Sequence, residues 1–455
     1  MKLRAWQTNC VNTAFEKYLA GHQHFMCLAT PGAGKTIMAS QVAKRLLLQG
    51  HIDFVLCFSP SAVVAQGIRE TFASQLGCNF EGGIGDTGAS YTYQGMLYRK
   101  DSFWQLLKRH KVLVVFDEIH HCAGSCELDA NSWGAKILTE IQGYAAYTLA
   151  LTGTPWRSDS APIVLASYTD DDGQVLCDYS YGLADAITDG VCRVPKIVLV
   201  DNDKLQITRD GETESFSSFN ELLKSKSASY LSIITQYDAM KYVLQKGCET
   251  LAKLRKSNSN PGGLVVAASV SHANMLLKIL VNELGQTAEI VTYHERNPLV
   301  KIEQFKQANI QWIVSVGMIS EGTDIPRLQV CCHLSTVKTE LYFRQVLGRI
   351  LRKTSTPNQE AWLYTLAEER LSIYAERVEQ NIPEAFSNPN NSAFGEAELS
   401  IQTGSQPVTN HEEIDLSLGA VSNDSICGFG HIEDDPSFPR LLLGDFRERL
   451  ISAFM

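Results

Sequence analysis

The feature that most limits the fold is a repeated alternation of short apolar runs with longer helical patterns. The first series of apolar runs lies at residues 24–29, 54–59, 112–116 and 148–151. A second series lies at residues 264–268, 289–292, 312–316, 330–334 and 361–365 of the 455-residue chain. Continuous apolar runs separated by helices are typical of parallel strands that helices cover on both faces. The chain is therefore predicted to be an α/β protein with two doubly wound, parallel-sheet lobes in tandem.

Changes in composition divide the chain into residues 1–195, 196–385 and 386–455. The second part contains a polar insertion near residues 201–229, in which Asp210 and Gly211 suit a tight hairpin turn; a solvated insertion fits the pattern equally. Residues 230–255 have the pattern of one long helix, which ends before a stretch rich in Asn, Pro and Gly.

The third part is acidic, with 11 acidic against 3 basic side chains between residues 390 and 455. Its content of Asn, Ser, Gly and Pro predicts loose order. Residues 438–454 have helical spacing and enough apolar side chains to dock on another surface. We expect an acidic C-terminal tail that ends in a docking helix and offers a site to a protein partner.

Charge and hydropathy exclude two classes of protein. With 40 Lys and Arg against 50 Asp and Glu, the net charge of −10 excludes a polycation that coats nucleic acid. No run approaches the ~20 apolar residues of a membrane-spanning helix, and the first residues lack the apolar core of a signal peptide. The 12 scattered cysteines suit buried thiols, so we expect a cytoplasmic protein that contacts no membrane.

The sequence ATPGAGKT at residues 29–36 follows a predicted strand and precedes a helical pattern. Gly32 and Gly34 let the backbone curl so that amide hydrogens point at an anion at a helix N-terminus. Lys35 is predicted to reach the outer phosphates of a nucleoside triphosphate, and the Thr36 hydroxyl to ligate Mg²⁺. Ala29 replaces the first glycine of the pattern G-x-x-x-x-G-K-[ST], and a glycine-rich turn without a ligand is the alternative.

Two adjacent carboxylates, Asp117 and Glu118, end the apolar run at residues 112–116. Ligands bind at the carboxyl edge of open parallel sheets, and repulsion between the two carboxylates favours a cation there. We expect Asp117 to hold Mg²⁺ through water, and Glu118 to orient and deprotonate an attacking water. A solvated helix start is the alternative.

The order of these motifs resembles superfamily 2 helicases and translocases, in particular the ResIII-like group related to restriction-enzyme motor subunits. ATPGAGKT, DEIH at 117–120 and LTGTP at 151–155 resemble motifs I, II and III, and LRAWQ at 3–7 resembles the glutamine element. Residues 58–66, 92–96, 265–276, 316–326 and 345–352 resemble motifs Ia, Ib, IV, V and VI, and 182–195 the segment that leaves the first lobe. The resemblance covers about residues 1–370 and implies two RecA-like lobes with ATP in the cleft between them.

The resemblance also implies roles for single residues. Gln7 is expected to read the adenine edge, and Gln345 to help place the attacking water or the γ-phosphate. Arg349 and Arg352, three apart on one predicted helix, are expected to present guanidinium groups from the same face and to act as arginine fingers across the cleft. A basic surface helix is the alternative.

Motif V is expected to couple the nucleotide to nucleic acid. Gly322 permits a loop, Thr323 suits a phosphate contact, and Asp324 suits a ribose or the γ-phosphate region. Contacts to nucleic acid in this family go mainly to phosphates, with little base specificity. The candidates for such contacts are Ser59, Gln66, Thr92, Gln94, Ser269, Ser271 and Thr323.

The cysteine-containing clusters point to structure more than to metal binding. HHCAGSC at residues 120–126 invites a zinc hypothesis, but tetrahedral zinc sites usually use two separated pairs of ligands. Cys331 and Cys332 lie in an apolar run and are expected in the core.

The patterns together predict an ATP hydrolase that needs ATP and Mg²⁺ and works as a nucleic-acid helicase or translocase, on DNA rather than RNA. Hydrolysis in the interlobe cleft would drive movement along a strand. The alternative is an ATP-gated nucleic-acid-binding or recruitment subunit of a larger repair or defence complex, without unwinding activity.

Overall fold

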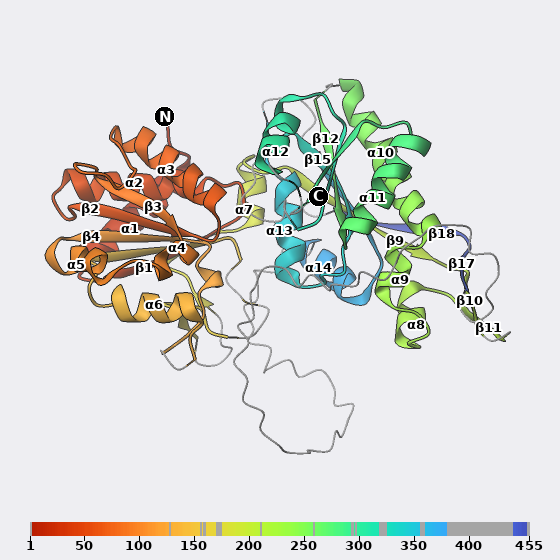
Figure 1. The fold of residues 1–455 in the computed structure, drawn as a ribbon, viewed down its shortest axis with the longest axis horizontal. Helices are drawn as coiled ribbons and strands as arrows, with labels where there is room; N and C mark the ends of the chain where they lie inside the picture. Colours follow the sequence, from red (N-terminus) through yellow and green to blue (C-terminus); the bar gives the residue numbers. More distant parts are fainter. Residues whose placement is uncertain are drawn as a thin grey trace, which may run out of the picture.

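The computed structural model describes residues 2–126, 129–154, 157, 161–169, 175–209, 212–257, 260–292, 295, 298–317, 325–354, 360–379 and 440–452. These residues form two α/β lobes that lie side by side, one built from each series of apolar runs (Figure 1). The predicted fold class, two parallel-sheet α/β lobes in tandem, is confirmed.

The sheet of the first lobe has the strand order β3-β2-β4-β5-β1-β8, and every pairing in it is parallel. Its strands are β1 (His24–Ala29), β2 (Phe54–Ser59), β3 (Gly88–Thr92), β4 (Val112–Asp117), β5 (Tyr147–Thr152) and β8 (Tyr179–Tyr181). A separate antiparallel pair is formed by β6 (Ser167–Tyr168) and β7 (Val175–Leu176). The four apolar runs predicted as strands in this lobe are confirmed, and the sequence analysis missed β3 and β8.

Helices cover both faces of this sheet. One face packs against α1 (Ala5–Leu19), α2 (Lys35–Leu48) and α3 (Ala62–Leu76). The other packs against α4 (Tyr93–Leu97), α5 (Asp101–Arg109) and α6 (Ser132–Glu140). Because side chains alternate along a strand, Cys27 points to the first face and Met26 to the second. The one-turn η1 (Ile119–His121) follows β4, and α7 (Leu183–Thr188) follows β8.

The sheet of the second lobe has the order β13-β14-β12-β15-β16-β9-β18. Its parallel strands are β9 (Val194–Asn202), β12 (Gly262–Ala267), β13 (Ala288–Val291), β14 (Trp312–Ser315), β15 (Leu328–Leu334) and β16 (Glu360–Leu366). The edge strand β18 (Phe446–Ser452) runs antiparallel to β9. All five predicted runs of the second series are strands, and β9 joins them from the segment between the lobes.

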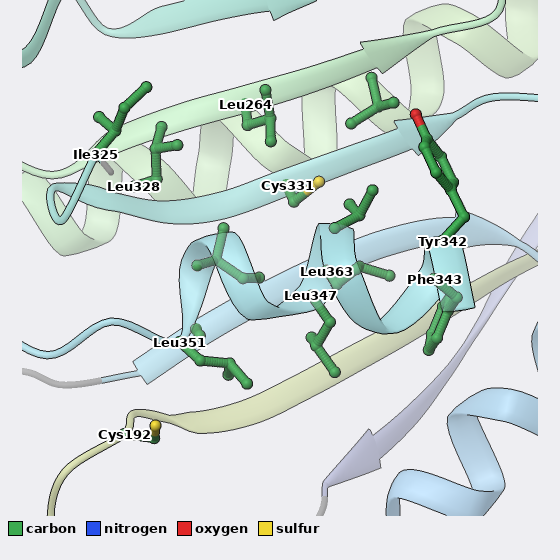
Figure 2. Packing of buried hydrophobic residues seen from close by; sticks show 14 of the residues in the cluster. Cys192, Leu264, Ile325, Leu328, Cys331, Tyr342, Phe343, Leu347, Leu351 and Leu363 are labelled. Atoms are coloured by element: carbon green, nitrogen blue, oxygen red, sulfur yellow. The ribbon is translucent and has the colours of Figure 1, made fainter. Parts of the chain in front are cut away.

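Helices cover this sheet on both faces as well. They are α10 (Tyr237–Ser257), α11 (Val270–Lys278) with the π-helical η2 (Ile279–Glu283), α12 (Pro298–Gln307), α13 (Glu340–Ile350) and α14 (Glu369–Glu379). Cys331 and Cys332 are both fully buried in β15, as predicted. Cys332 Sγ contacts the Val243 carbonyl of α10 at 3.6 Å, whereas Cys331 lies on the side of α13 (Figure 2). Among the described helices, none has the length and apolarity to cross a bilayer.

Two local predictions about the second part of the chain have different outcomes. The hairpin at Asp210 and Gly211 is supported, because β10 (Leu205–Arg209) and β11 (Glu212–Phe216) pair antiparallel on either side of these two residues, which lie outside the described part. The single helix over residues 230–255 is wrong. It is divided into α9 (Tyr230–Ile234) and α10, because Gln236 Oε1 accepts a hydrogen bond from Ala239 N–H at 3.0 Å and caps a new helix. The short α8 (Phe219–Lys224) precedes both.

The predicted docking helix at residues 438–454 is also wrong. Its described residues form β17 (Arg440–Leu443), which pairs with β10, and β18, which pairs with β9. Edge strands carry unpaired backbone N–H and C=O groups, and pairing with them outweighs the helical spacing of the side chains. The Phe446 ring also stacks on Tyr242 of α10, with the ring centroids 4.3 Å apart. The end of the chain is therefore part of the second lobe.

The edge strand β18 makes a testable contribution to stability. Ile451 is 1% exposed and its neighbour Leu450 is 52% exposed, as expected for successive residues of a strand. Ile451→Ala should lower the free energy of unfolding by about 2–4 kcal/mol, and the matched control Leu450→Ala by less than about 0.5 kcal/mol. Urea denaturation followed by circular dichroism measures both, and equal effects would contradict the assigned register.

Candidate functional site

The glycine-rich loop between β1 and α2 has the curled backbone that the sequence predicts. Gly32 and Gly34 have φ angles of +83° and +95°, in the left-handed region that favours glycine. The helix begins at Lys35, so its N-terminal amide groups and the positive end of its dipole face the loop. Lys35 Nζ donates to the Ala29 carbonyl at 3.2 Å, which holds the lysine across the loop.

The two carboxylates lie directly opposite this lysine. Asp117 is the last residue of β4, and Glu118 follows it with φ +51°, a left-handed conformation that costs a non-glycine residue about 1–2 kcal/mol. Glu118 Oε1 lies 3.1 Å from Lys35 Nζ, and Glu118 Oε2 accepts a hydrogen bond from Gly153 N–H at 3.2 Å. Lys35, Glu118 and Gly153 therefore form one polar cluster.

Burial and charge act on the two carboxyl groups in opposite directions. Burial, and then repulsion by Glu118, raise the pKa of Asp117. Burial also opposes ionisation of Glu118, but Lys35, His120 and the Gly153 N–H together outweigh it and lower its pKa. Asp117 Oδ1 is buried and accepts no hydrogen bond from the described residues. Such an unpaired carboxylate oxygen, on a residue that lines the same cavity as Thr36, suits a bound cation, so the residues present fit Mg²⁺.

The residues after β4 and β5 are joined by a hydrogen-bond network. Thr152 Oγ1 donates its one hydrogen to the Thr154 carbonyl at 2.9 Å. Its contact with His120 Nδ1, also at 2.9 Å, is therefore one in which the threonine oxygen accepts. His120 Nδ1 lies 3.5 Å from Glu118 Oε2. Thr152 and Thr154, in the segment that resembles motif III, are thus connected to Glu118 through His120.

The N-terminal helix contacts the glycine-rich loop. Gln7 is 2% exposed, its Nε2 donates to the Gly34 carbonyl at 3.0 Å, and its Oε1 accepts from the Arg4 N–H at 2.9 Å. Arg4 Nη1 donates to the Ala33 carbonyl at 2.6 Å. Both polar ends of the Gln7 amide are therefore bonded within the protein, where the sequence analysis expected an adenine contact.

The second lobe completes the site. A cavity of about 450 Å³ is lined from the first lobe by Gly32, Gly34, Lys35, Thr36, Asp117 and Glu118, and from the second by Gln345, Arg349, Arg352 and Lys353. The lobes are in close contact here, since a Cβ atom at Gly348 would lie 2.9 Å from Pro31 Cβ, and one at Gly32 would lie 3.2 Å from Arg352 Cγ. The structure thus brings the predicted nucleotide residues of both lobes to one cavity.

The expected helical spacing of the two arginines needs correction. Arg349 lies in the last turn of α13, but Arg352 lies beyond the end of this helix, where it forms an antiparallel bridge with Cys192. Arg349 and Arg352 both line the cavity. Arg352 is directed there by its bridge to Cys192 and not by a helix face that it shares with Arg349.

The predicted nucleic-acid residues differ in their exposure and contacts. Gln66, Gln94, Ser269 and Ser271 are exposed, and Thr92 Oγ1 caps α4 by accepting from Gly95 N–H. Ser59 does not fit its predicted role, because its side chain is fully buried and its hydroxyl donates to the Ser61 carbonyl. Gly322, Thr323 and Asp324 lie outside the described residues.

Sequence reasoning missed several cavity residues. Arg4 and Lys353 line the cavity as further cations, and Val191 and Pro326 line it from the connections to β9 and β15. The i, i+3 spacing of Arg4 and Gln7 at a helix start was an available signal. Val191 and Pro326 lie within segments 182–195 and 316–326, which the sequence analysis compared with family motifs without giving either residue a role, and no local pattern marks Lys353. Among the described residues, no three His, Cys, Asp or Glu side chains gather as metal ligands.

Comparison with known sequences finds a family match for the first part of the chain and relatives of most of it. Residues 1–157 match the family described as Type III restriction enzyme, res subunit (ResIII). The uncharacterized protein Rv2917 of Mycobacterium tuberculosis is 30% identical over 393 residues, which cover 83% of this chain and 63% of Rv2917. ML1624 of Mycobacterium leprae is 30% identical over 392 residues, which cover 83% of this chain and 64% of ML1624. The chain therefore spans less than two thirds of the length of these relatives.

Solved structures agree on the fold. A fragment described as an HsdR subunit of a type I restriction enzyme from Vibrio vulnificus YJ016 has a TM-score of 0.55 and 15% identity, and the match covers 82% of this chain and 66% of that one. The ATP-dependent type ISP restriction-modification enzyme LlaBIII, in complex with DNA, has a TM-score of 0.52 and 12% identity, over 81% of this chain and 28% of that one. These structures show the fold, two RecA-like α/β lobes in tandem, and residues 1–157 are similar in sequence to the ResIII family.

The contacts of Gln7 predict a loss of stability that does not require any ligand. Gln7→Ala leaves the Gly34 carbonyl and the Arg4 N–H without their partner and should lower the free energy of unfolding by about 1–3 kcal/mol. Gln7→Glu can still accept from the Arg4 N–H, but it places a carboxylate oxygen against the Gly34 carbonyl oxygen. Its free energy of unfolding should therefore also be lower than that of the wild type. Urea denaturation without nucleotide measures both variants; wild-type stability of Gln7→Glu would contradict the assigned amide orientation.

Proposed function

We propose that this chain is a nucleic-acid-stimulated ATPase that works as a helicase or translocase, with DNA as its polymer. The observation that carries the proposal is the single cavity lined by the glycine-rich loop and carboxylates of one lobe and by the arginines of the other. A phosphate cradle alone can bind a triphosphate, but hydrolysis also needs charge that stabilises the transferring phosphoryl group.

Binding of the triphosphate begins with an exchange of partners at Lys35. Its Nζ lies 3.1 Å from Glu118 Oε1 in this structure, so it must leave this carboxylate to reach the phosphates. The amide groups at the start of α2 then hold the phosphate oxygens. Once Lys35 has moved away, Glu118 becomes a stronger proton acceptor, because Lys35 is the main attraction that lowers the pKa of Glu118.

The hydrolytic step uses the remaining groups of the first lobe. Thr36 and Asp117 would hold Mg²⁺, which neutralises phosphate charge when it is bound. Glu118 orients a water and accepts its proton, and the Gly153 N–H keeps its carboxylate in place at 3.2 Å. Gln7 and Arg4 stabilise the loop, because their side chains donate hydrogen bonds to the Gly34 and Ala33 carbonyls.

The second lobe supplies the positive charge that stabilises the transferring phosphoryl group. Arg349 and Arg352 act on the phosphoryl oxygens when the lobes close, and Gln345 helps to place the water or the γ-phosphate. Alternate closing and opening of the lobes would change the grip on a strand and move the protein along it. Candidate contacts with the strand are the exposed Gln66, Gln94, Ser269 and Ser271, together with Thr92 and Thr323.

DNA is the preferred polymer in this proposal because residues 1–157 match a restriction-enzyme family and the similar enzyme LlaBIII was solved bound to DNA. ATP turnover measured with single-stranded DNA, duplex DNA, forked DNA and RNA tests the polymer and the need for it. Paired strand-displacement and triplex-displacement assays separate unwinding from translocation. Turnover that no polymer stimulates would favour an ATP-gated recruitment subunit instead.

Lys35→Ala should abolish ATP turnover, with a loss of about 10³-fold or more, because Lys35 lies across the loop between β1 and α2 and is the cation proposed to reach the phosphates. Phosphate release measures the rate. The exposed cation Lys306, which pairs with Glu303 on α12, gives the control variant Lys306→Ala. Turnover that survives in Lys35→Ala would remove the phosphate-loop assignment.

Arg352→Ala and Arg349→Ala should each retain ATP binding within about threefold and lower the rate of hydrolysis by about 10³-fold or more. A fluorescent ATP analogue measures binding, and single-turnover hydrolysis measures the chemical step. An equal loss of binding and hydrolysis would contradict the arginine-finger role.

A further inference from the structure

Arg193 is a buried arginine in the segment that joins the two lobes. It lies between α7 of the first lobe and β9 of the second and is 1% exposed. Its neighbours on the chain reach the cleft, since Val191 lines the cavity and Cys192 Sγ lies 3.9 Å from the Pro31 carbonyl of the glycine-rich loop.

The Arg193 guanidinium bonds to backbone carbonyls on two separate segments of the second lobe. Nη2 donates to the Pro326 carbonyl at 3.0 Å, and Nη1 donates to the Leu328 carbonyl at 2.6 Å, both at the start of β15. Nη1 also donates to the Ile350 carbonyl at 3.0 Å, at the end of α13. A planar guanidinium fork can hold two such segments at once.

The end of α13 is thereby capped from outside the helix. The last carbonyls of a helix have no partner within it. Arg193 supplies two donors, since its side chain bonds to Ile350 and its backbone N–H bonds to the Leu351 carbonyl at 2.7 Å. A positive charge at this end is also favoured by the helix dipole.

These contacts determine where Arg352 lies. Arg352 follows the capped residues directly and bridges to Cys192, the residue before Arg193. Its Cγ is 3.2 Å from the place that a Cβ atom of Gly32 would occupy. Figure 2 shows Cys192, Leu351, Ile325 and Leu328 together at the end of the sheet where β9 and β15 begin. This end of the sheet therefore carries the arginine that reaches the glycine-rich loop.

A second buried arginine of the same lobe makes a matched comparison. Arg327 is 5% exposed, and its guanidinium donates to the Asn260, Phe305 and Ile310 carbonyls. Burial lowers the pKa of Arg193 and of Arg327 to about 10 each, so both remain charged at neutral pH. Arg327 is thus a buried, charged arginine like Arg193, but the three residues whose carbonyls it binds do not line the cavity.

We propose that Arg193 is a positioning residue that holds Arg352 in the nucleotide cavity and so joins the interlobe segment to ATP hydrolysis. The proposal rests on the proposed function, in which Arg352 is an arginine finger. A misplacement of about 1 Å at such a group can cost roughly 100-fold in rate. Lysine has one compact ammonium group and cannot span the Pro326 and Ile350 carbonyls together.

The experiment measures ATP hydrolysis by the full chain with its stimulating polynucleotide for Arg193→Lys and for the control Arg327→Lys. Arg193→Lys should lower kcat by about 10- to 100-fold and leave KM and the binding of a fluorescent ATP analogue within about threefold. Arg327→Lys should keep kcat within about threefold. Urea denaturation of both variants shows whether they lose comparable stability.

The same substitutions in an Arg352→Ala background separate positioning from a general structural role. If Arg193 acts through Arg352, Arg193→Lys should lower the residual rate by less than about threefold there. A full 10- to 100-fold loss in that background, or an unchanged kcat in the single variant, overturns the proposal. Arg193→Gln, which keeps two amide donors, replaces Arg193→Lys should the latter not fold, with the same expected outcomes.

The failure of this proposal and of the proposed function can be told apart. If the wild-type chain hydrolyses no ATP with any polynucleotide, or if Arg352→Ala has no effect, the proposed function fails and the role of Arg193 fails with it. If Arg352→Ala lowers the rate but Arg193→Lys does not, the role of Arg193 alone is wrong.

Discussion

The close contact between the glycine-rich loop and the end of α13 is the constraint on which the site depends. Pro31 faces Gly348 so closely that a Cβ atom there would lie 2.9 Å from Pro31 Cβ, and Gly32 faces the Arg352 side chain, where a Cβ atom would make a tight contact of 3.2 Å. Two glycines on two different lobes therefore allow the lobes to approach. Because of this approach, cations from the second lobe line the same cavity as the glycine-rich loop and Lys35 of the first.

The site is assembled at some cost to stability, as functional sites commonly are. Glu118 has a left-handed backbone, and Asp117 has a buried carboxylate oxygen without a described partner. Lys35 offsets part of the repulsion between the two carboxylates by pairing with Glu118. Surrounding hydrogen bonds keep this arrangement in place, including the bond from the Tyr93 hydroxyl to the Asp117 carbonyl at 2.8 Å. A bound cation would reduce the repulsion between the two carboxylates and give the buried Asp117 oxygen a partner, and a bound phosphate would pair with Lys35.

Local chemistry explains which sequence predictions the structure bears out. Strands buried on both faces need continuous apolar residues, so all nine strands could be predicted from the apolar runs in the sequence. Contacts that apolar periodicity does not record, both local and non-local, explain the errors. The last residues have helical spacing but pair with the open edges of β10 and β9. Gln236 divides one apparent helix into two because its side chain caps the second. Ser59 ends a strand as expected, yet its side chain is buried and its hydroxyl donates to the Ser61 carbonyl.

The sequence by itself determined the fold class and the composition of the site, because a curled glycine loop, a lysine at a helix start and carboxylates at a strand end depend on residues close together in the chain. Only the tertiary structure decided how the two lobes share the site. Arg352 lies in the cavity because of a bridge to Cys192 and because Arg193 caps the helix before it, across more than 150 residues of chain. Such contacts leave no periodic trace in a sequence, since each depends on where distant backbone carbonyls come to lie after folding.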